Sequence, residues 1–80
     1  MDKIATDLKK LMAEIFLVAE DKITEVTSME TTKSWDSLQH LNLMLAVEEH
    51  FDIKLDTDEI PKATSFSILY NLIANKQSGR

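Results

Sequence analysis

Apolar residues recur at the spacing of an α-helix over residues 3–18, and this pattern restricts the fold more than any other feature of the chain. The apolar face consists of Ile4, Leu8, Leu11, Met12, Ile15 and Phe16. Charged residues fall mostly on the opposite face, as in a helix with one buried side. Only one glycine and one proline occur in 80 residues, which argues against a turn-rich β fold. Because there is no cysteine, no disulfide can stabilise the chain, and helix packing must form the core.

A second apolar segment follows a helix-start signal at Asp36. Asp36 is a favoured N-cap residue, and Gln39, three residues later, can complete a capping box. We expect a helix over residues 37–50, whose middle, residues 41–47, is apolar at all positions but one. A single buried stripe needs fewer apolar residues than this. We therefore expect a helix that packs on two neighbours, with Leu41 in the core and some apolar surface left for partners.

The segments on either side of this helix predict connections of two kinds. Residues 19–35 have no clean period, and we expect a long first loop that Ile23, Val26 and Met29 hold against the bundle. Residues 51–55 alternate like a β-strand, but no second strand is available to pair with them. We expect an extended segment there, with its apolar side chains turned inward.

Two further helices are expected near the C-terminus. Asp56, with Glu59 three residues later, is a second capping-box signal, and Pro61 limits the helix that follows to a turn or two. Thr64 or Ser65 then caps a last helix with apolar residues at helical spacing.

Together these segments predict an all-α fold: a four-helix bundle with three longer helices, one short helix and a long first loop. We expect one domain over residues 1–80, with a frayed tail at 74–80, and a monomer. The net charge of −5 makes a nucleic-acid partner improbable on electrostatic grounds. The N-terminus lacks the features of a signal peptide and no apolar run is long enough to span a membrane, so we expect a cytoplasmic protein.

Ser37 is the residue with the clearest chemical potential. As the first residue of its expected helix, it lies beside unpaired backbone N–H groups and the positive end of the helix dipole. A phosphate attached to its hydroxyl would therefore occupy a site that favours anions.

The residues around Ser37, together with those that follow at fixed distances, resemble the acyl carrier protein family. The matching positions are Asp36, Ser37, Leu38, Leu41, Glu48, Glu49, Phe51, Ile53, Thr64, Phe66 and Leu69. The resemblance covers nearly the whole chain. It implies that Ser37, supported by Asp36 and Leu38, carries a covalent 4'-phosphopantetheine arm derived from coenzyme A. The arm's thiol would hold an acyl group as a thioester.

The resemblance also implies a protein that is not itself an enzyme. Its expected partners are a phosphopantetheinyl transferase and acyl ligase, acyltransferase or synthase enzymes. The residues expected to dock these partners are Leu38, Gln39, Asn42, Met44, Glu48 and Glu49. No metal site is expected, because His40 and His50 lack ligand spacing and are predicted at the surface.

Departures from the fatty-acid carriers at two places predict a specialised function. Gln39 and Asn42 stand where those carriers have acidic residues. Lys33, Ser34 and Trp35 stand where those carriers usually have a small residue or leucine and a glycine. Charge at an interface controls partner choice, so we expect a stand-alone carrier of a fatty-acid-like, polyketide or other secondary pathway. Trp35 either packs against His40 or Leu41 as a hydrophobic staple or lines an entrance for the acyl chain.

Two other functions remain open at this point. The chain could be a helical adaptor without a cofactor that binds a partner through Leu38, Met44 and Val47. It could also carry an aminoacyl group. A DNA-binding helical domain is disfavoured by the charge.

Overall fold

The computed structural model describes residues 3–78, and its regular secondary structure is helical throughout. The helices are α1 (Lys3–Phe16), α2 (Ser37–Phe51) and α3 (Phe66–Ser78), with single 3₁₀ turns η1 (Glu20–Lys22) and η2 (Ile60–Lys62). The predicted all-α fold is confirmed, and η2 is the short fourth helix. None of the helices in this part of the chain has the length and apolar character needed to cross a membrane.

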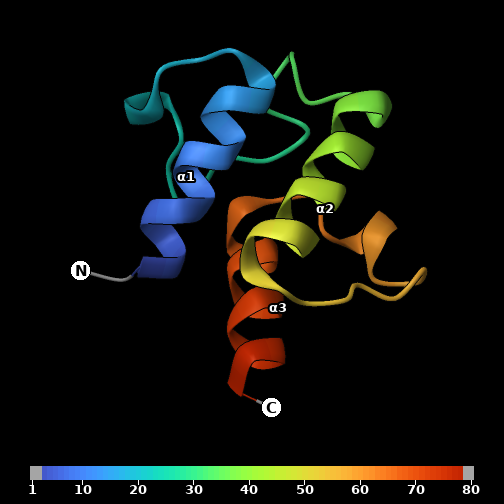
Figure 1. Cartoon of the computed structure of the whole chain (residues 1–80). Helices are drawn as coiled ribbons and strands as arrows, with labels where there is room; N and C mark the ends of the chain where they lie inside the picture. Colours follow the sequence, from blue (N-terminus) through green and yellow to red (C-terminus); the bar gives the residue numbers. More distant parts are fainter. Residues whose placement is uncertain (1–2, 79–80) are drawn as a thin grey trace.

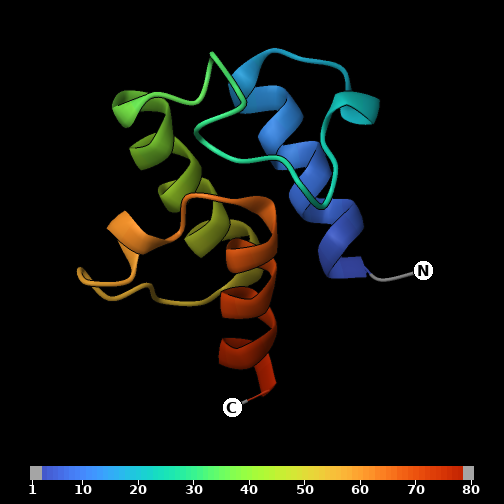
Figure 2. The same ribbon diagram turned by 180° about the vertical axis from the view of Figure 1, so that it is seen from behind.

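The three α-helices form a small bundle in which α1 packs against both α2 and α3 (Figure 1). The long connection between α1 and α2 crosses over α1 in the view from behind (Figure 2). Two backbone hydrogen bonds join this connection to the start of α3, from Met29 N to Thr64 O and from Phe66 N to Thr27 O, both 2.8 Å long. The loop before α2 is therefore tied to the bundle and is not a free linker.

The core draws apolar side chains from each α-helix. Its most deeply buried members include Leu8, Met12 and Phe16 of α1, Leu43, Met44 and Val47 of α2, and Leu69 and Ile73 of α3. Leu41 is 54% exposed, so the prediction that it belongs to the core is wrong. The buried positions of α2 recur at helical spacing through Leu43 and Val47, and this spacing puts Leu41 on the outward face.

The connections mostly behave as their apolar residues predict. Ile53 and Leu55 are each 8% exposed, which confirms that the extended segment turns them inward. In the first loop, Ile23 is buried and Met29 packs against the core. Val26 is 83% exposed, so its expected role in holding the loop is wrong.

Both α1 and α2 end in a left-handed residue that is not glycine. Leu17 has φ 58° and Asp52 has φ 55°. The residue after each donates its N–H back into the helix, from Val18 to Ala13 O and from Ile53 to Glu48 O. This is the hydrogen bonding of a glycine-type helix end, formed here at the steric cost of a side chain in the left-handed region.

The C-terminal elements are held by specific side chains. Asp56 N donates to Glu59 Oε1 at 2.9 Å, which is one half of the expected capping box. The prediction that Asp56 is the N-cap is wrong, because η2 begins at Ile60 and its N-cap is Glu59. Ser65 caps α3 by accepting a hydrogen bond from Ile68 N at 3.2 Å. The helix continues to Ser78, and Gln77 Nε2 donates to Phe51 O at 3.4 Å. Residues 74–78 of the segment that was expected to fray belong to this helix, and residues 79–80 lie outside the described part.

Candidate functional site

Ser37 is the first residue of α2, and its side chain is exposed. The preceding Asp36 is the N-cap, and its Oδ1 accepts a hydrogen bond from Gln39 N at 2.9 Å. The predicted N-cap is confirmed, but Gln39 does not complete a capping box, because its Oε1 accepts from Asn42 Nδ2 at 2.9 Å instead. The cap uses one first-turn N–H group and leaves the others near Ser37 available to an anion.

Trp35, immediately before the cap, is turned into the protein and is 2% exposed. Its indole ring stacks on Phe16 of α1 with 5.0 Å between ring centroids. It also stacks on His40 at 6.0 Å, and its Nε1 donates to His40 Nδ1 at 3.0 Å. Trp35 and His40 occupy the N' and N4 positions of α2, so the predicted staple is confirmed and includes a buried hydrogen bond.

His40 links the start of α2 to η2. Its Nε2 lies 2.6 Å from the carbonyl oxygen of Ile60. Because an indole N–H can only donate, Nδ1 of His40 must accept, and the ring proton therefore resides on Nε2 and is donated to Ile60 O. His40 is 6% exposed, so its predicted surface position is wrong. The available signal was its position on the same helix face as Leu43 and Val47.

The predicted docking residues divide into exposed and buried groups. Leu38 is 67% exposed, Asn42 is exposed and Gln39 is partly exposed. Met44 is 2% exposed and belongs to the core, so its predicted docking role is wrong. It lies on the inward face of α2 beside Leu43.

Sequence reasoning missed two residues of the outward face. Leu41 is 54% exposed and Leu45 is 62% exposed. Leu41 follows Leu38 by three residues, and Leu45 follows Leu41 by four. These three side chains form a leucine stripe along α2, with Gln39 and Asn42 beside it. The spacing of these leucines was visible in the sequence. A buried helix face has the same spacing, so the positions of the neighbouring helices are needed to tell that this face is exposed.

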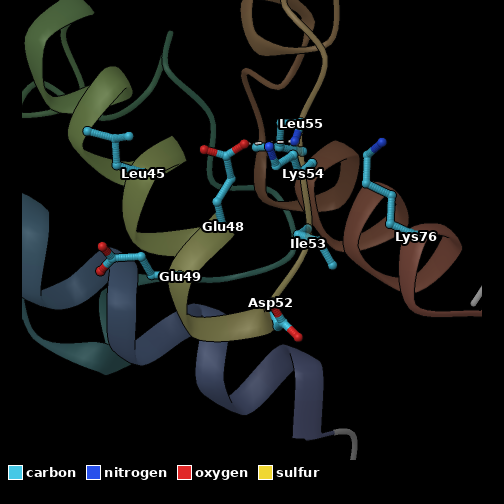
Figure 3. Close-up of a pocket in the computed structure, with 8 residues that line it drawn as sticks. All are labelled: Leu45, Glu48, Glu49, Asp52, Ile53, Lys54, Leu55 and Lys76. Atoms are coloured by element: carbon cyan, nitrogen blue, oxygen red, sulfur yellow. Dashed lines mark hydrogen bonds between the residues drawn. The ribbon is translucent and has the colours of Figure 1, made fainter.

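Glu48 and Glu49 have different surroundings. The carboxylate of Glu48 crosses to the extended segment, where Oε2 accepts a hydrogen bond from Leu55 N at 2.8 Å (Figure 3). Glu49 is exposed and points away from this contact in the same view. Glu48 therefore holds residues 52–55 against α2, and Glu49 is the freer of the two charges.

An open groove runs between the end of α2, the extended segment and Lys76 of α3 (Figure 3). Lys76 Nζ lies 2.9 Å from Glu59 Oε1, just beyond the groove. The backbone N–H of Asp56, and after it the Lys76 ammonium, lower the pKa of Glu59. The hydrogen bond to Glu59 in turn raises the pKa of Lys76. This ion pair joins η2 to the last turn of α3.

His50 lies at the surface, as predicted, and its Nε2 is 3.1 Å from Asp7 Oδ2. This hydrogen bond is the main reason that the pKa of Asp7 is lowered. Within residues 3–78 no three histidine, aspartate or glutamate side chains gather as a metal site would require.

Similar proteins and a similar solved structure belong to one family. No protein-family model matches the chain. The chain is similar to the acyl carrier protein of Buchnera aphidicola subsp. Baizongia pistaciae, with 30% identity over 73 residues that span 91% of this chain and 94% of that protein. The acyl carrier protein of Buchnera aphidicola subsp. Schizaphis graminum is 29% identical over 95% of this chain and 96% of its own length. The solution structure of holo acyl carrier protein from Geobacter metallireducens superimposes with a TM-score of 0.84 and 27% identity, over 98% of this chain and 90% of that one.

Proposed function

This chain belongs to the acyl carrier protein family, and we propose that Ser37 bears the 4'-phosphopantetheine arm on which it carries an acyl group. The observation that carries the proposal is the exposed serine at the first position of α2, directly after its aspartate cap. Family members of this kind serve as carriers for other enzymes. We propose that the helical bundle presents the acyl group to these enzymes and performs no chemistry on it.

The surroundings of Ser37 fit such a group. Within residues 3–78 the Ser37 hydroxyl has no hydrogen bond to give up on modification. A phosphodiester on that oxygen would lie beside first-turn N–H groups and the positive end of the α2 dipole, both of which favour an anion. The arm would supply the thiol that this cysteine-free chain lacks.

The leucine stripe is the surface we propose for docking partner enzymes. Its three leucines leave apolar area in water, and its flanks at Gln39 and Asn42 are uncharged. Of the two glutamates at the far end of α2, only Glu49 is free of a structural hydrogen bond in the described contacts. Binding should therefore rest more on apolar contact and less on charge than in a carrier with an acidic stripe.

This surface supports a specialised role. Interface charge selects partners, and enzymes that read a continuous acidic stripe would find few acidic residues on the first half of α2. We propose a phosphopantetheinyl transferase and acyl ligase, acyltransferase or synthase enzymes as partners, in a fatty-acid-like, polyketide or other secondary pathway. If enzymes of general fatty-acid elongation use the acyl form as readily as their own carrier, this part of the proposal is wrong.

The direct test is intact mass spectrometry. Wild-type protein is incubated with coenzyme A, Mg²⁺ and a broad-specificity phosphopantetheinyl transferase, beside Ser37→Ala and the control Ser34→Ala. We expect wild type and Ser34→Ala to gain one phosphopantetheine unit, and Ser37→Ala to gain none.

The opposite result would favour the cofactor-free adaptor. The adaptor hypothesis predicts that folded wild-type protein, verified by circular dichroism, gains no mass with the broad-specificity transferase or with one from the source organism. It also requires Ser37→Ala to retain partner binding.

A further inference from the structure

The interior beside the start of α2 is filled by the side chain of Trp35. This residue precedes Ser37 by two positions and is 2% exposed. Its indole lies between α1 and α2, stacked on Phe16 at 5.0 Å and on His40 at 6.0 Å. The interior on the α1 side of this helix start is therefore occupied by packed side chains.

His40 closes the other side of the same turn. Its ring is 6% exposed and bridges α2 to η2 through the 2.6 Å contact with Ile60 O. Both nitrogens are engaged, one with Trp35 and one with Ile60. Moving either ring aside would leave a buried donor or acceptor without a partner, which is strongly unfavourable.

The surface hollows described over residues 3–78 are open to solvent, and none of them is lined by Trp35 or His40. The one that includes Ser34 is lined by the apolar residues Phe16, Leu17, Val18 and Ile23 as well as by Lys22 and Lys33, and it is open to solvent. A groove that is open to water on one side does not enclose an alkyl chain, so it removes only part of the chain's apolar surface from water.

We infer that Trp35 excludes the cargo from the bundle, so that this carrier takes short or polar acyl groups in preference to long alkyl chains. The inference rests on the proposed attachment at Ser37. An alkyl chain held outside exposes its whole apolar surface to water, whereas a short or polar group loses little by remaining there. Trp35 is then the residue that determines which class of cargo the carrier suits.

The test compares acetyl and octanoyl forms, made by transferring acyl-phosphopantetheine from the matching acyl-coenzyme A. Cleavage of each thioester by hydroxylamine is timed and divided by the rate for the same thioester on free pantetheine. In the wild type we expect the two normalised rates to agree within about twofold, whereas a buried chain would slow the octanoyl form at least about tenfold. Since Trp35 is the single tryptophan, its indole N–H resonance should also be unchanged by octanoyl loading.

Trp35→Ala should open the space and protect the octanoyl thioester at least about tenfold relative to the wild type. Ile73→Ala, which removes an equally buried side chain in α3, is the control and should give no such protection. If Trp35→Ala does not fold, Trp35→Leu replaces it. The comparison of acetyl and octanoyl cleavage rates in the wild type tests the exclusion of the cargo without any variant.

Protection of octanoyl in the wild type, or a shift of the indole resonance on loading, would overturn the inference. A failure of the proposed function is seen earlier and separately, because no acyl-phosphopantetheine mass would then be added at Ser37.

Discussion

Replacing His40 with leucine should destabilise the fold by about 1.5–4.5 kcal/mol, although the new side chain is apolar and of similar size. The indole N–H of Trp35 is buried and would lose its acceptor at a cost of about 1–3 kcal/mol. The carbonyl of Ile60 is partly buried and would lose a hydrogen bond worth about 0.5–1.5 kcal/mol. The sum is a large share of a total stability of about 5–15 kcal/mol.

A double-mutant cycle isolates the buried pair. Trp35→Phe removes the donor, so His40→Leu in that background leaves no orphaned indole N–H, and the coupling between the two changes should be about 1–2 kcal/mol. Urea denaturation followed by far-ultraviolet circular dichroism measures all four proteins, because Trp35→Phe abolishes tryptophan fluorescence.

His50→Leu is the matched control, since that ring is 45% exposed and pairs with Asp7 at the surface. Its effect should stay below about 1 kcal/mol. Two results would refute the reasoning: His40→Leu no more destabilising than His50→Leu, or a coupling energy that cannot be told from zero.

Three other changes test separate parts of the fold. Leu43→Ala should cost about 2–5 kcal/mol because the side chain is 0% exposed, whereas Leu41→Ala on the leucine stripe should stay within about 0.5 kcal/mol. Similar urea midpoints for the two variants would show that the inward face of α2 is misplaced. Leu17→Gly should stabilise by about 0.5–1 kcal/mol in thermal denaturation, because the residue is left-handed and 86% exposed. A lower melting temperature would contradict this. The pKa of Glu59 is lowered from its ordinary value of 4.5, so its carboxylate stabilises the fold above that pH, and the contribution is lost as the pH falls through the lowered pKa. Glu59→Gln should therefore lose less stability than the wild type between about pH 5 and pH 3 in urea titrations, and equal losses would exclude this role.

The positions of the helices and of the candidate serine were predictable because their signals are local. Asp36 marks the start of α2 by capping a backbone N–H three residues away, and Ser65 does the same for α3. Such contacts are encoded within one turn of the chain. For the same reason the N' and N4 positions of Trp35 and His40 allowed the staple to be proposed.

The residues that were misplaced depend on contacts between distant segments. The buried ring of His40 finds its second hydrogen-bond partner in the backbone carbonyl of Ile60, which lies twenty residues later in the chain. The last turn of α3 is held by a hydrogen bond from Gln77 to the Phe51 carbonyl and by the ion pair between Lys76 and Glu59. No local sequence pattern predicts either contact.

The apolar middle of α2 shows both what local sequence signals predict and what they leave undecided. Composition and periodicity are enough to predict a helix there, because propensity and spacing act within the segment. They leave open which of its leucines turn inward, since every position but one is apolar. Only the placement of α1 and α3 decides that Leu43 enters the core and Leu41 stays in water. Burial is a property of the neighbours that cover a face, and those neighbours lie elsewhere in the chain.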